Sequence, residues 1–231
     1  MKKRMHRMVW AVLLACSLAV ATHAGPAGDW KVLRKKNIAC GFSDERVDQV
    51  LAECRKYGLS ASETDALLSM VYIAHAEQLP AGCVYLKIEE GFAKGIPVEQ
   101  IHPAAAKRLD CLRRADGLVM SIRNGRGGQH QHLVQHMCMA MESGLPEEVI
   151  EHVINRPGGF RYGRLIHVIE AGESLQLAGL PPSQIQQVMS DCLDRDLTGP
   201  EVMRVVEVIQ TGLRDGMEFE AIHDALWVAS D

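Results

Sequence analysis

Apolar residues recur at intervals of three and four along most of this 231-residue chain. That interval places apolar side chains on one face of an α-helix. The stretch 202–209, with valine, methionine and isoleucine at these intervals, is typical. Strand patterns are weak, because the chain has no long alternating run and no Asn-Gly pair between β-branched segments. The hydrophobic pattern therefore predicts an all-α fold.

A short sequence motif occurs five times. It consists of a glycine, one apolar residue, a polar or proline-containing turn, and the start of a new stripe of apolar residues. Glycine adopts the left-handed backbone conformation in which many helices end, and an apolar residue after it suits the contact that accompanies such an end. Serine, proline or glutamate in the next places suits the first turn of another helix. The five glycines are Gly58, Gly95, Gly144, Gly179 and Gly216, separated by 37, 49, 35 and 37 residues.

An isoleucine stands six residues after four of these glycines, and Thr64 takes that place after the first. Together with apolar residues nine and ten positions after each glycine, it forms one stripe on the second helix. Repeats of this length are typical of stacked helical hairpins. We therefore predict antiparallel helical hairpins of about 36 residues, stacked as a short right-handed solenoid. If the motif is only a common helix connection, the chain is still all-helical.

The interval between Gly95 and Gly144 is longer than the others by about 12 residues. Gly117 and Leu118 inside it resemble another helix end, but Arg123 stands where the repeat isoleucine is expected. We therefore expect the extra residues to form a loop or an irregular repeat.

The first 24 residues have the pattern of a secretory signal peptide: a basic start, an apolar run of 14 residues, and alanine before Gly25. The run is short for a membrane span. Cys16 follows Leu-Leu-Ala, which resembles a lipoprotein signal, so lipidation of Cys16 is the alternative to cleavage after Ala24. The apolar run continues past Cys16, which favours cleavage. We predict a signal peptide at 1–24, a polar lead-in at 25–42 and a helical-repeat domain at 43–231.

The net charge of the chain excludes some classes of binding partner. Removal of residues 1–24 takes away four basic residues and no acidic ones, which leaves 21 basic and 29 acidic residues and a net charge of about −8. That balance argues against a general binder of nucleic acids or anionic membranes. The chain contacts a membrane, on this interpretation, only if Cys16 is lipidated.

Six cysteines follow residue 24. An even number in an exported protein favours at least one disulfide. The alternative is that the cysteines are small buried residues on helix faces, a common role of free cysteine.

Two glycine-rich, basic segments, 123–131 and 155–164, interrupt the repeat at comparable places. Arginine offers forked donors and glycine exposes backbone amides, so these segments are the expected contact surface for an acidic partner. Solvated loops without a partner are the alternative. The expected partner-binding residues are Arg123, Arg126, Phe160, Arg161, Tyr162 and Arg164.

His130, His132 and His136 form the one candidate metal site. His132 and His136 are four residues apart and share a helix face, where two imidazoles can bind one metal ion, and His130 could add a third. The alternative is a run of polar residues at the start of a helix. No nucleotide-binding, haem-attachment or nucleophile motif occurs, so we expect no cofactor and assign no catalytic residue.

The sequence favours an exported, non-enzymatic interaction or scaffold module of a bacterial envelope, periplasmic or secreted, with an envelope protein as its partner. A periplasmic protein that binds a metal or small ligand through residues 130–136 is the first alternative, and an all-α envelope enzyme is the second. A lipid-anchored envelope lipoprotein is the alternative location.

The mature protein is expected to begin near Gly25, because a small residue follows the uninterrupted apolar run there. N-terminal sequencing of the protein from its native cell measures this directly. A diacylated Cys16 at the new terminus would instead establish the lipoprotein.

Overall fold

The computed structural model describes residues 27–122, 129–156 and 162–228, and the predicted signal peptide with Cys16 lies outside them. Within these ranges the chain forms helices and no strands, which confirms the all-α prediction. The helices are α1 (Ala27–Ala39), α2 (Asp44–Lys56), α3 (Ala61–Ala76), α4 (Ala81–Ala93), α5 (Val98–Ile122), α6 (His130–Glu142), α7 (Glu147–Ile154), α8 (Tyr162–Leu177), α9 (Pro182–Asp194), α10 (Gly199–Arg214) and α11 (Phe219–Val228). None of them combines the length and apolar character that a membrane span requires.

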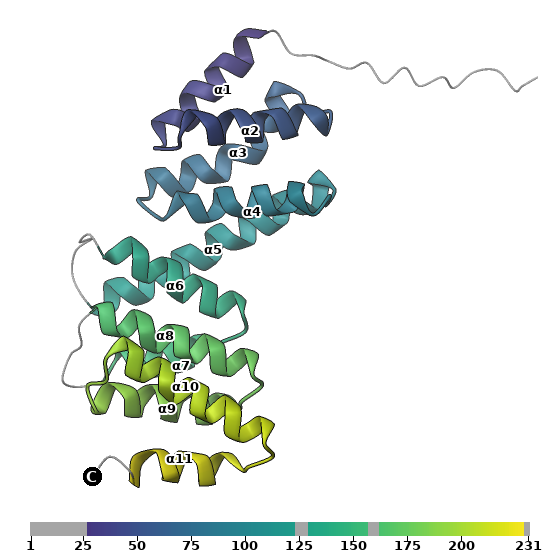
Figure 1. Ribbon diagram of the computed structural model, residues 1–231. Helices are drawn as coiled ribbons and strands as arrows, with labels where there is room; N and C mark the ends of the chain where they lie inside the picture. Colours follow the sequence, from purple (N-terminus) through teal and green to yellow (C-terminus); the bar gives the residue numbers. More distant parts are fainter. Residues whose placement is uncertain (1–26, 123–128, 157–161, 229–231) are drawn as a thin grey trace, which may run out of the picture.

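The helices stack one above another from α1 at one end to α11 at the other (Figure 1). Each packs on helices close to it in the chain, as α3 does on α4 and α5, and α8 on α6, α9 and α10. Side chains about one repeat apart also bond: the Tyr57 hydroxyl donates to Phe92 O at 3.0 Å, and Gln210 Nε2 donates to Ser174 O at 3.2 Å. The period in the sequence therefore corresponds to the number of residues between helices that lie next to each other in the stack.

Each of the five predicted glycines ends a helix in the left-handed conformation, with φ between 66° and 98°. At the first, the Leu59 amide donates to Cys54 O and the Gly58 amide to Arg55 O, both at 2.9 Å. This pair of bonds satisfies carbonyls that a helix end leaves free, and it recurs at the other four glycines. Gln78 and Asp196 make the same turn at φ 59° and 56°, and these two turns were not predicted because no glycine marks them in the sequence.

The repeat isoleucine packs on the helix that precedes the turn. A Cβ on Gly91 would lie 2.6 Å from Ile101 Cγ1, and one on Gly212 would lie 2.6 Å from Ile222 Cδ1. Both glycines stand four residues before the turn glycine, where their bare backbone lets the isoleucine approach. At these two turns, the apolar face predicted from the sequence therefore packs the second helix on the first.

Two segments differ from expectation. The lead-in at 25–42 contains α1, which packs on α2 and α3 and buries Leu33, so the helical part begins before residue 43. Gly117 ends no helix, because the apolar Leu118 and Val119 that follow it are buried and the helix continues to Ile122. The long interval before Gly144 thus contains a helix of 25 residues, α5, which agrees with the irregular repeat that was one of the two expectations.

The disulfide prediction is not supported, because all six cysteines after residue 24 are free thiols. Five of them are buried on packed helix faces, and Cys40 is partly exposed. Cys111 donates through Sγ to Cys138 O at 3.4 Å instead of bonding to sulfur. The cysteines thus act as small core residues, which was the alternative interpretation.

Replacing Gly91 by alanine should lower the free energy of unfolding by about 1–3 kcal/mol, since the new methyl would overlap the buried Ile101. Gly117→Ala is the matched control. Gly117 is also inside a helix, but a Cβ there meets no atom within 4 Å, so alanine should stabilise by about 0.4–1 kcal/mol. Urea unfolding followed by circular dichroism measures both. Equal effects at the two positions would contradict this account of the repeat isoleucine.

Candidate functional site

The predicted basic surface is described only in part. Arg123, Arg126, Phe160 and Arg161 lie outside the described residues, and Tyr162 begins α8. Arg164 forms an ion pair with Asp196, just after α9. Arg156, in the same segment, pairs with Asp194 at the end of α9. The described arginines of this segment are therefore neutralised by acidic residues.

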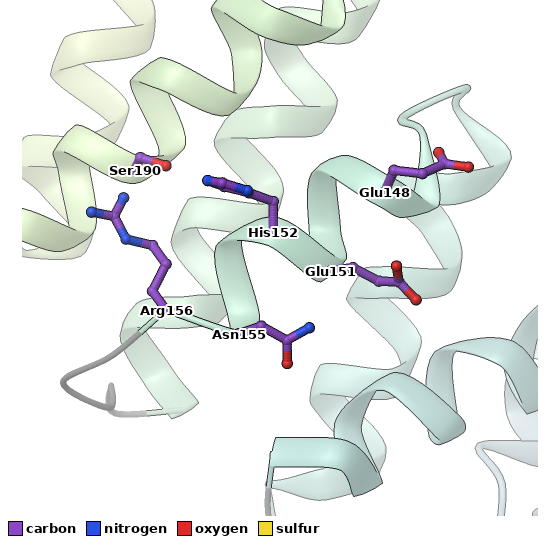
Figure 2. Close-up of a pocket in the computed structure, with 6 residues that line it drawn as sticks. All are labelled: Glu148, Glu151, His152, Asn155, Arg156 and Ser190. Carbon is purple, nitrogen blue, oxygen red and sulfur yellow. The ribbon is translucent and has the colours of Figure 1, made fainter.

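A groove of about 720 Å³ lies between α7 and α9. The helix α7 has only eight residues and turns its apolar side chains inward, so that its polar ones face the groove. In Figure 2, His152 and Arg156 point toward Ser190, whereas Glu148 and Glu151 point away from it. The lining residues are Glu148, Glu151, His152, Asn155, Arg156 and Ser190.

The described residues of the groove are arranged for polar contacts with a partner, and they show no arrangement of a nucleophile with its base. Its carboxylates lie toward one end and its arginine and imidazole toward the other, so it suits a partner with charged and hydrogen-bonding groups (Figure 2). A serine nucleophile needs a base within hydrogen-bond reach. No hydrogen bond is present between Ser190 and His152, both of which are described residues.

The histidines of the candidate metal site separate into two environments. His130 is 2% exposed, and its Nε2 lies 2.6 Å from Asp116 Oδ1, so it ties the start of α6 to α5. His132 and His136 instead face each other, with their Nε2 atoms 3.2 Å apart. The structure therefore brings together two of the three predicted ligands and directs the third elsewhere.

Helix α8 contributes to the histidine pair. Glu170 Oε1 lies 3.2 Å from His136 Nδ1, and Glu170 Oε2 lies 3.1 Å from His167 Nδ1. Burial lowers the pKa of His136 below its ordinary value, although the negative charge of Glu170 acts in the opposite direction. The sequence analysis gave Glu170 and His167 no role. Their spacing of three on one helix was visible in the sequence, but their contact with α6 was not.

A second cluster of possible metal ligands lies between α5 and α6, with two buried cysteines and an exposed glutamate. Atoms of Cys111, Cys138 and Glu142 lie within 4.8 Å of one another. Arg108 already binds Glu142, with Nε 2.6 Å from Oε1, and the pKa of Cys138 is raised by hydrogen bonding with Cys111 and by burial. The Glu142 carboxylate is thus paired with Arg108 and the Cys138 thiol keeps its proton, whereas the hydrogen bond with Cys138 lowers the pKa of the Cys111 thiol. A metal ion there would compete with the Arg108 guanidinium for the carboxylate.

No protein-family model, curated protein or solved structure matches the chain. The sequence and geometry of the molecule itself therefore bear on its function. The groove between α7 and α9 is the candidate functional site, because polar and charged side chains line it while the apolar side chains of α7 are buried on the other face.

His130→Ala should lower the free energy of unfolding by about 1–3 kcal/mol, since it removes a buried hydrogen bond to a carboxylate. His132→Ala, on the exposed side of the same helix, should change it by less than about 0.5 kcal/mol. Chemical denaturation of both variants compares them. If His132→Ala proved the more destabilising, the assignment of His130 as the structural histidine would be wrong.

Proposed function

We propose that this protein is an exported, non-enzymatic interaction module of a bacterial envelope, periplasmic or secreted. Its helical hairpins form a short right-handed solenoid, and a polar segment of an envelope protein binds in the groove between α7 and α9. The signal-peptide pattern of residues 1–24 supports export. The recurrence of side-chain bonds one repeat apart supports the solenoid.

The observation that carries the proposal is the polar lining of this groove. Its volume of about 720 Å³ is within the range of binding sites in proteins. Pockets for small molecules are lined mainly by apolar and aromatic side chains, whereas each of the described residues that line this groove is polar or charged. An extended protein segment with its own polar groups fits such a lining better than an apolar ligand does.

The charged side chains of the groove indicate which charges the bound partner segment should carry. Glu148 and Glu151 are exposed or partly exposed carboxylates, and neither makes an ion pair inside the groove. Arg156, at the other end, is already paired with Asp194. The groove therefore favours a basic residue of the partner beside Glu148 and Glu151.

Site-specific photo-crosslinking in the native cell tests the docking groove. A photoreactive residue in place of Glu151 or Asn155 should give the same discrete adduct, identified by mass spectrometry. The matched control is Glu99, an exposed carboxylate on α5 far from the groove, which should give none of that adduct.

A Glu148→Gln/Glu151→Gln variant should then reduce crosslinking from Asn155 several-fold without a change in helicity, because exposed charges add little to stability. Equal adducts from Glu99 and Glu151, or full crosslinking in the double variant, would refute the groove as the docking site.

A further inference from the structure

The two imidazoles of His132 and His136 converge on one point in space. Their Nε2 atoms are 3.2 Å apart, whereas their ring centroids are 4.6 Å apart and the ring planes meet at 77°. The nitrogens are thus on the converging edges of the rings. Two imidazole nitrogens that share a metal ion at about 2.0–2.1 Å are about 2.8–3.4 Å apart for octahedral to tetrahedral angles. The observed separation matches that of a chelating pair.

We propose that His132 and His136 bind one divalent transition-metal ion through their Nε2 atoms, with water in the remaining coordination positions. Imidazole suits Zn²⁺, Ni²⁺ and Cu²⁺, whereas Mg²⁺ and Ca²⁺ prefer oxygen ligands. The site is on α6 and α8, away from the groove between α7 and α9, so it is independent of the docking proposal.

Glu170 is the positioning residue. The Oε1 atom of its carboxylate lies 3.2 Å from His136 Nδ1, where the negative charge favours a proton on Nδ1 and so leaves the Nε2 lone pair free to bind a metal. His167 holds the other carboxylate oxygen at 3.1 Å. The His167 ring is itself seated against Gly199, where a Cβ would lie 2.5 Å from ring atom Cδ2. A metal-bound imidazole commonly has such a carboxylate on its other nitrogen.

Charge and access also favour a cation. The negative charges of Glu170 and Glu173 act on His136 from α8. The His136 side chain is 17% exposed and His132 is exposed, so an ion reaches the pair from solvent. In the cluster of Cys111, Cys138 and Glu142, by contrast, the Arg108 guanidinium occupies the carboxylate and repels a cation.

Calorimetric titration of the purified mature protein with Zn²⁺ and with Ni²⁺ tests the site. We expect one bound ion and a loss of affinity of at least about tenfold in both His132→Ala and His136→Ala, because each removes one of two ligands. Glu170→Gln should weaken binding by about tenfold. The matched controls are His102→Ala, an isolated exposed helix histidine, and Glu173→Gln, which should each stay within about threefold.

Nuclear magnetic resonance of the histidine side chains keeps the test independent of folding defects in the variants. In the unaltered protein, Zn²⁺ should shift the Nε2 signals of His132 and His136 and leave that of His130 unchanged. Glu170→Gln should alter the balance of ring tautomers at His136, which a merely structural role would not do. The proposal is overturned if neither ion binds, if binding survives both histidine replacements, or if it is lost in Cys111→Ser/Cys138→Ser and not in the histidine variants.

Discussion

The left-handed helix end is the interaction on which this molecule depends. At each such turn two backbone amides satisfy carbonyls of the helix that is ending, and the chain leaves in a new direction within a few residues. Each of these bonds joins residues three or five positions apart, so the turn is made within a few residues of the chain. The next helix then lies on the last one, and Ile101 on Gly91 shows how closely the two approach.

Stacking follows from repetition of this turn. A helix that leaves each turn in a similar way meets residues about one repeat away, which is why Tyr57 bonds to Phe92 and Gln210 to Ser174. Helices that are longer or shorter than the others change the surface of the molecule and leave its core intact. The long α5 retains its buried face through Leu118 and Val119, and the short α7 leaves a polar groove beside α9.

Polar clusters in the stack have two distinct roles. His130 with Asp116 and Arg108 with Glu142 are largely buried pairs that join neighbouring helices, and each satisfies charge inside the molecule. His132 and His136 are at the edge of the stack, where water and ions reach them. Burial thus separates side chains of the same chemistry into those that hold helices together and those that face solvent.

The sequence by itself determined the all-α fold, five of the turns and the pairing of His132 with His136, because glycine preference and the helical period act over a few residues. Gln78 and Asp196 make the same turn without glycine. Gly117, in contrast, ends no helix, because the buried residues after it continue α5. In both cases packing outweighs the conformational preference of the single residue. Only the tertiary structure decided that Glu170 meets His136, that His130 turns to Asp116, and that α7 and α9 border a groove. Those contacts join different helices, and a chain pattern carries no information about which faces meet across the stack.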